Sequence, residues 1–186
     1  MSSGDAFHQR GEALENQFFA KVDEELVKKL REKQEVQDLQ KMLGVCDSTA
    51  KSLHALGVST ETSAALRLAP LVAVAWADGL LESKERDAVL QAAALHGITQ
   101  DQPSGKLLSV WLQSPPPRDC LEFWCEYAAT LVSNLTPEAA QSLKESIVND
   151  LKKVASATGG VLGWGAVSDG ESAILRRVEA ALTRKN

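Results

Sequence analysis

Val74-Ala-Trp-Ala-Asp-Gly-Leu-Leu-Glu-Ser-Lys-Glu85 is the stretch of this 186-residue chain that says most about how it folds. An apolar helical run ends within it, the Asp78-Gly79 pair predicts a turn, and the acidic segment that follows is typical of a new helix. The apolar run extends back to Leu66 and is interrupted only by Arg67 and Pro70. We therefore expect a buried central helix that is followed, across a tight turn, by an amphipathic one.

The rest of the chain carries the same kind of signal, because helix-start residues alternate with glycine stops and no segment alternates between apolar and polar residues. This pattern predicts an all-α protein. Pro103 and the Thr136-Pro137 pair suit the first turn of a helix, and Ser168-Asp-Gly-Glu171 fits a capping box. The other expected N-caps and C-terminal stops are Ser48, Thr60, Ser83, Gly44, Gly57 and Gly97.

The amino-terminal segment differs from the remainder in composition. Residues 5–41 contain nine Asp or Glu and seven Lys or Arg, no proline and one internal glycine, Gly11, which predicts one long charged helix. Its apolar stripe wanders around the helix and keeps no strict heptad, which disfavours a long coiled-coil homodimer. We divide the chain into a charged helical arm, residues 1–44, and an α-helical domain, residues 45–186. The arm is too long to lie on a domain of this size, so one end should project.

Composition and charge exclude several classes of partner. The formal net charge of −5 provides no basic field that would attract nucleic acid. The three cysteines are odd in number and lack CxxC spacing, so neither a disulfide framework nor a zinc site is indicated. No apolar run is long enough for a membrane span, and no signal peptide is recognisable at the amino end. These features predict a soluble cytoplasmic protein.

Catalytic motifs are not recognisable in the chain. His8, His54 and His96 are scattered and belong to no nucleophile or metalloprotease signature. The glycine-rich segment 159–165 lacks the lysine and the spacing of a phosphate-binding loop, and we interpret it as a tight crossing in which two apolar side chains, Leu162 and Trp164, enter the core. We therefore expect that the protein is not an enzyme.

Acidic residues gather at two Asp-Gly pairs, Asp78-Gly79 and Asp169-Gly170, each of which we expect to form a turn just before a helix. If the helices bundle, these carboxylates can converge, and oxygen ligands of this kind suit Ca²⁺ or Mg²⁺. The local alternative is that each Asp accepts backbone N–H bonds, each Gly takes a positive φ, and each Glu complements a helix dipole. The candidate metal ligands are Asp78, Glu82, Glu85, Asp169 and Glu171.

The same acidic stretch resembles a known family. The run Ala73-Val-Ala75-Trp-Ala77-Asp78-Gly79-Leu-Leu-x-Ser83-x-Glu85-Arg86 is similar to the signature of the tellurite-resistance TerB family. The resemblance spans residues 60–182 and implies a non-enzymatic all-α domain of two related helical halves, with an acidic surface that binds a divalent metal. Asp78 and Glu85 match the signature acids, and Asp169 and Glu171 match more loosely. The chain departs from the family by a triple-proline break, residues 115–117, and by the glycine-rich segment.

The arm has a separate, short resemblance. Phe7-x-x-Arg10-x-x-Ala13-Leu14-Glu15-x-x-Phe18, followed by Asp23-Glu-Glu25, looks like the opening of the zeta inhibitor subunit of bacterial F-type ATP synthases. That resemblance implies that the arm enters the rotary motor. The alternative is a solvated helix that packs on its own domain. The candidate partner-binding residues are Phe7, Arg10, Leu14, Glu15, Phe18 and Phe19.

These observations predict a non-catalytic interaction or regulatory protein. Its N-terminal helical arm docks on a protein partner, and its TerB-like domain carries a weak divalent-cation site. The first alternative is an inhibitor of a rotary F-type ATPase that acts through the arm. The second is a metal-dependent enzyme that uses the acids at Asp78 and Asp169, which no recognisable base or nucleophile accompanies.

Overall fold

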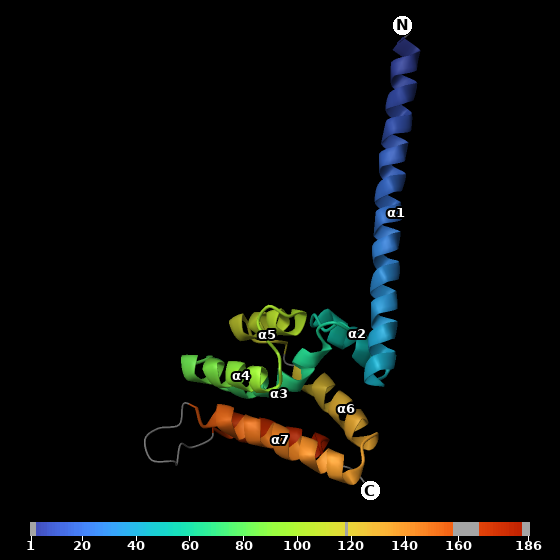
Figure 1. Ribbon diagram of the computed structural model, residues 1–186. Helices are drawn as coiled ribbons and strands as arrows, with labels where there is room; N and C mark the ends of the chain where they lie inside the picture. The colour runs from blue at the N-terminus through green and yellow to red at the C-terminus, as the bar shows by residue number, and fades with distance from the viewer. Residues whose placement is uncertain (1–2, 118, 158–167, 184–186) are drawn as a thin grey trace.

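Helices are the only regular elements in the computed structural model, which describes residues 3–117, 119–157 and 168–183, with side chains from residue 17 onward. The prediction of an all-α protein is therefore confirmed. Figure 1 shows a group of short helices with one very long helix projecting from it. The elements are α1 Ser3–Leu43, α2 Asp47–Ala55, the 3₁₀ helix η1 Ser63–Leu68, α3 Ala69–Ala75, α4 Ser83–Leu95, α5 Pro103–Gln113, α6 Cys120–Ser133, α7 Pro137–Ala155 and α8 Asp169–Ala181.

The central helix is α3, which packs against α4, α6, α7 and α8. All of its residues except Ala73 are buried, as the apolar run predicted. The run does not form one continuous α-helix, because Pro70 has no N–H to donate to the preceding turn. The residues before it form η1. The N-cap of η1 is Thr62, in place of the expected Thr60. The N–H and hydroxyl of Thr60 instead donate to Glu35 Oε1 over 2.8 and 3.0 Å.

Several helix boundaries lie where local chemistry predicted them. Thr136 Oγ1 accepts from the N–H of Ala139 at the start of α7, and Ser168 and Glu171 form the expected reciprocal capping box of α8. Besides Thr60, two expected N-caps are wrong by one or two residues. The N-cap of α4 is Glu82 in place of Ser83, and that of α2 is Cys46 in place of Ser48. The predicted stops at glycines 44, 57 and 97 all take positive φ.

The arm helix α1 contains 41 residues and is about 60 Å long at 1.5 Å per residue. Its carboxy-terminal turns pack against α2, and both Val36 and Leu39 are buried there. Glu35, through its bonds to Thr60, ties the same turns to the loop before η1. From residue 17 to residue 34, every side chain except the half-buried Val22 is exposed. The arm is therefore anchored at one end and projects at the other, as Figure 1 shows.

The proposed core crossing of Leu162 and Trp164 in the glycine-rich segment lies outside the described residues. Among the described residues, no helix is both long enough and apolar enough to cross a membrane.

Candidate functional site

The exposed part of the arm carries large apolar side chains. Phe18 is 64% exposed and Phe19 is 60% exposed, and their rings lie 5.8 Å apart in an edge-to-face arrangement. The other predicted partner-binding residues, Phe7, Arg10, Leu14 and Glu15, lie in α1, but their side chains are outside the described part of the chain.

Three further exposed apolar residues extend this surface toward the domain: Leu26, Val27 and Leu30. At 100° per residue, Phe18, Val22, Leu26 and Leu30 follow one another around the helix in steps of about 40°. They form a continuous stripe that turns slowly around α1. We call Phe18, Phe19, Val22, Leu26, Val27 and Leu30 the arm stripe. The sequence interpretation did not assign the last four residues to the binding surface, although they belong to the same apolar pattern.

The first Asp-Gly pair forms the turn between α3 and α4. Asp78 Oδ1 accepts the N–H of Leu80 over 3.0 Å, and Gly79 has a φ of 88°. Glu85 is buried in the first turn of α4, where its Oε2 accepts the N–H of Glu82 over 3.0 Å. These are the local roles that the alternative interpretation of the acids assigns to Asp78, Gly79 and Glu85.

The second Asp-Gly pair is not a turn, which corrects one expectation. Asp169 and Gly170 already belong to the first turn of α8, and Gly170 has no positive φ because helical geometry needs none. The pair nevertheless lies against the first one. A Cβ atom added to Gly170 would come within 3.2 Å of the carbonyl oxygen of Ala77. The start of α8 therefore packs closely on the beginning of the segment that follows α3.

The acids of the two segments influence one another electrostatically. Burial raises the pKa of the Glu85 carboxyl, the N–H bond from Glu82 opposes that shift, and the negative charges of Asp78, Glu171 and Glu82 raise the pKa further. Glu171 is itself buried and accepts the N–H of Ser168 over 2.6 Å. Four of the five predicted acids, Asp78, Glu82, Glu85 and Glu171, are therefore near enough to interact electrostatically.

Convergence alone does not make a metal centre. In the part of the chain that the structure describes, no group of three or more His, Cys, Asp or Glu side chains is arranged to hold a metal ion. Two of the buried carboxylates, Glu85 and Glu171, each accept a backbone N–H within their own helix start. A weak Ca²⁺ or Mg²⁺ site at these acids stays a prediction.

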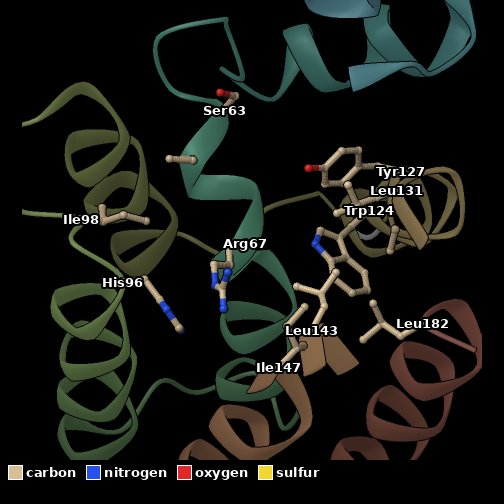
Figure 2. A pocket seen from close by; sticks show the side chains of 12 residues that line it. Ser63, Arg67, His96, Ile98, Trp124, Tyr127, Leu131, Leu143, Ile147 and Leu182 are labelled. Atoms are coloured by element: carbon tan, nitrogen blue, oxygen red, sulfur yellow. The ribbon is translucent and has the colours of Figure 1, made fainter. Parts of the chain in front are cut away.

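A cavity of about 250 Å³ lies on another side of the domain, among η1, the end of α4, α6 and α7 (Figure 2). The sequence interpretation assigned none of its residues to a site. Two of them, Arg67 and Trp124, have buried nitrogen atoms without a hydrogen-bond partner. One signal was visible in the sequence, since Arg67 is the charged residue that interrupts the apolar run leading into α3.

His96 also lines this cavity. It is the C-cap of α4, and its imidazole is bonded across the bundle, with Nε2 lying 2.7 Å from Asp150 Oδ2 on α7. Lys153 lies 3.4 Å from the other oxygen of the same carboxylate.

No family model, no curated protein and no solved structure matches this chain.

Proposed function

We propose that this is a non-catalytic interaction protein whose N-terminal arm docks on a protein partner. The observation that carries the proposal is the arm stripe, which exposes large apolar side chains on a helix that projects from the domain. Contiguous exposed apolar residues on one protein usually mark a docking surface. An amphipathic helix that stands free of its own domain is suited to enter an apolar groove on another protein.

The charges that flank the stripe are mixed, and this composition also supports a protein partner. An acidic block at residues 23–25 is followed by a basic block at residues 28–33, in which one glutamate lies among four basic residues. A nucleic acid or an anionic lipid surface would be repelled by the acidic block. A protein groove can present both signs of charge around an apolar centre, which fixes the direction in which the helix docks.

The test compares two single substitutions of exposed apolar residues in the full chain. Phe18→Ala should weaken capture of the partner by about 1 to 3 kcal/mol if its ring is an anchor. Leu80→Ala is the matched control, because Leu80 is 73% exposed but lies in the turn between α3 and α4. Both variants should unfold at the wild-type temperature. Equal capture by Phe18→Ala and wild type would place the binding surface elsewhere.

Deletion of residues 1–20 provides a second measurement. The truncation should abolish capture and leave the melting temperature nearly unchanged, since every described side chain in that segment is exposed. A truncated protein that still captures the partner, or that no longer folds, would contradict the proposal.

A rotary F-type ATPase is the candidate partner that the zeta-like run suggests, and Phe18, a residue of that run, is exposed and free to contact such a partner. The proposal that the remaining helices form a TerB-like domain is supported by their all-α architecture and by the close approach of Gly170 to Ala77. Purified bacterial F1-ATPase is the direct probe. Wild-type protein should slow its ATP hydrolysis and Phe18→Ala should do so less effectively. Hydrolysis that is unaffected by wild-type protein would remove this candidate and leave the capture experiment to identify another.

A further inference from the structure

The cavity between η1 and α6 combines an apolar wall with a small set of unused hydrogen-bond donors. Ile98, Leu131, Leu143, Ile147 and Leu182 contribute aliphatic side chains to the wall. Figure 2 shows the guanidinium of Arg67 and the indole nitrogen of Trp124 on opposite sides of the same space, with Leu143 and Ile147 at its lower edge. Ligand sites typically have this character, with apolar walls and a few placed polar groups.

Two of these donors, on Arg67 and Trp124, have no hydrogen-bond acceptor among the described residues. One terminal nitrogen of Arg67 donates to Ser146 Oγ over 3.1 Å, whereas its Nε is buried and unpartnered. Trp124 is only 2% exposed, and its Nε1 is also buried and unpartnered. Donors in this state are rare in folded proteins, because a buried N–H without an acceptor destabilises the fold. An acceptor group placed between these two side chains would satisfy both.

The charge at this place is positive and uncompensated. Among the described residues that line the cavity, Arg67 is the one with a permanent positive charge, and no carboxylate in the described part of the chain forms an ion pair with it. His96 already bonds to Asp150. Burial raises the pKa of Tyr127, although the charge of Arg67 opposes the shift, so its phenol remains protonated at neutral pH. The wall therefore suits an acceptor with a single negative charge and offers too little positive charge for a phosphate dianion.

The size of the cavity limits the rest of the ligand. A dry apolar cavity of roughly 150 Å³ holds benzene, so a volume of about 250 Å³ accommodates a ring or a short branched chain together with a carboxylate. The apolar residues on η1, α6 and α7 would contact the hydrocarbon part. A larger anionic amphiphile could enter only in part.

We propose that this cavity binds a small organic monocarboxylate with an aromatic or branched aliphatic body. The carboxylate lies between Arg67 and Trp124 and accepts their free N–H groups. The hydrocarbon body lies against Leu143 and Ile147. The site is independent of the arm and of the acidic residues at the starts of α4 and α8.

Titration of the ¹⁵N-labelled full chain with benzoate and 3-methylbutanoate tests the proposal. The indole N–H signal of Trp124, one of four such signals, is assigned from its loss in Trp124→Phe. It should shift saturably, with a dissociation constant on the order of 1 mM or tighter for ligands this small. Benzamide has the same shape without the charge, and acetate has the charge without the apolar body. Both should bind markedly more weakly.

Arg67→Met should weaken benzoate binding about tenfold or more, because it removes the charge and keeps an apolar side chain of similar length. The matched control is Arg176→Met, since Arg176 is exposed on α8 and does not line the cavity. If Arg67→Met fails to fold, the comparison of benzoate with benzamide on wild-type protein still decides. An unchanged Trp124 signal, equal shifts with benzamide, or full benzoate affinity in a folded Arg67→Met protein would each overturn the proposal and leave ordered water as the occupant.

Discussion

Leucine-to-alanine substitutions at two positions of α1 can show which part of the arm helix belongs to the folded core. The quantity compared is the change in the free energy of unfolding. Leu39 is fully buried near the end of α1, whereas Leu30, nine residues earlier, is 66% exposed. Both residues lie inside the helix and the chemical change is identical, so the small difference in helix propensity between Leu and Ala cancels in the comparison. What differs between the two positions is the packing around the side chain.

The expected magnitudes follow from that packing. Leu39 belongs to the main core, so its truncation removes buried methyl groups and leaves a cavity, which costs about 2 to 5 kcal/mol. At Leu30 the same truncation should change the free energy of unfolding by less than about 0.5 kcal/mol. For a chain of this size, 1 kcal/mol corresponds to about 2 to 4 °C. Leu39→Ala should therefore lower the melting temperature by about 4 to 20 °C, and Leu30→Ala by no more than about 2 °C.

Urea unfolding followed by circular dichroism gives both free energies, and thermal melts provide the second measurement. A loss of more than about 1 kcal/mol in Leu30→Ala would mean that the arm packs along its length, contrary to the exposed stripe. A neutral Leu39→Ala would mean that the arm is not anchored in the core. Either result would refute the assignment of the stripe to a partner surface on a projecting helix.

Three other predictions concern single groups. Cys46 is exposed, and hydrogen bonds with the side chains of Ser48 and Thr49 lower its pKa to about 7, whereas burial raises the pKa of Cys120 to about 11. Iodoacetamide should therefore modify Cys46 at neutral pH and leave Cys120 intact. Peptide mass mapping that finds equal rates would contradict this. The raised folded-state pKa of Glu85 means that folding disfavours ionisation of this carboxyl, so the free energy of unfolding of the wild type should fall as pH rises from about 4.5 through that raised pKa. Glu85→Gln should lack this loss. Superimposable pH profiles of the unfolding free energy for the two proteins would count against this prediction. Calorimetric titration with Ca²⁺ or Mg²⁺ should give a dissociation constant no lower than about 1 mM, and any heat of binding should be smaller in Asp78→Asn. A micromolar dissociation constant would contradict this and show that the acids form a metal centre.

Features that depend on neighbours in the chain could be predicted from the sequence alone. The Thr136 cap, the Ser168 to Glu171 capping box and the stop at Gly44 each use hydrogen bonds or backbone angles within about one helical turn. The buried central helix followed from its apolar run, because burial of such a run leaves few alternatives. The exposed arm followed from its length and charge.

Helix-start errors arose where two residues competed for the same role. Glu82 and Ser83 are both able to cap α4, and the bond between the Glu82 N–H and the buried Glu85 carboxylate favours the earlier start. The two Asp-Gly pairs suggested that the two acidic segments lie close together. Their proximity depends on the packing of α8 against the residues that follow α3, which the sequence does not specify.

The cavity itself is formed by the tertiary structure, although Arg67 was visible in the sequence as a charge within an apolar run. Arg67 and Trp124 are far apart in sequence, and neither residue type in its own segment predicts a ligand site. They come together because α6 packs against α3, which continues directly from η1. Short-range hydrogen bonds and hydrophobic periodicity are properties of a segment and can be read from it, whereas an unpaired buried donor is a property of what surrounds it. Only the packed helices decide which polar groups lose water without gaining a partner.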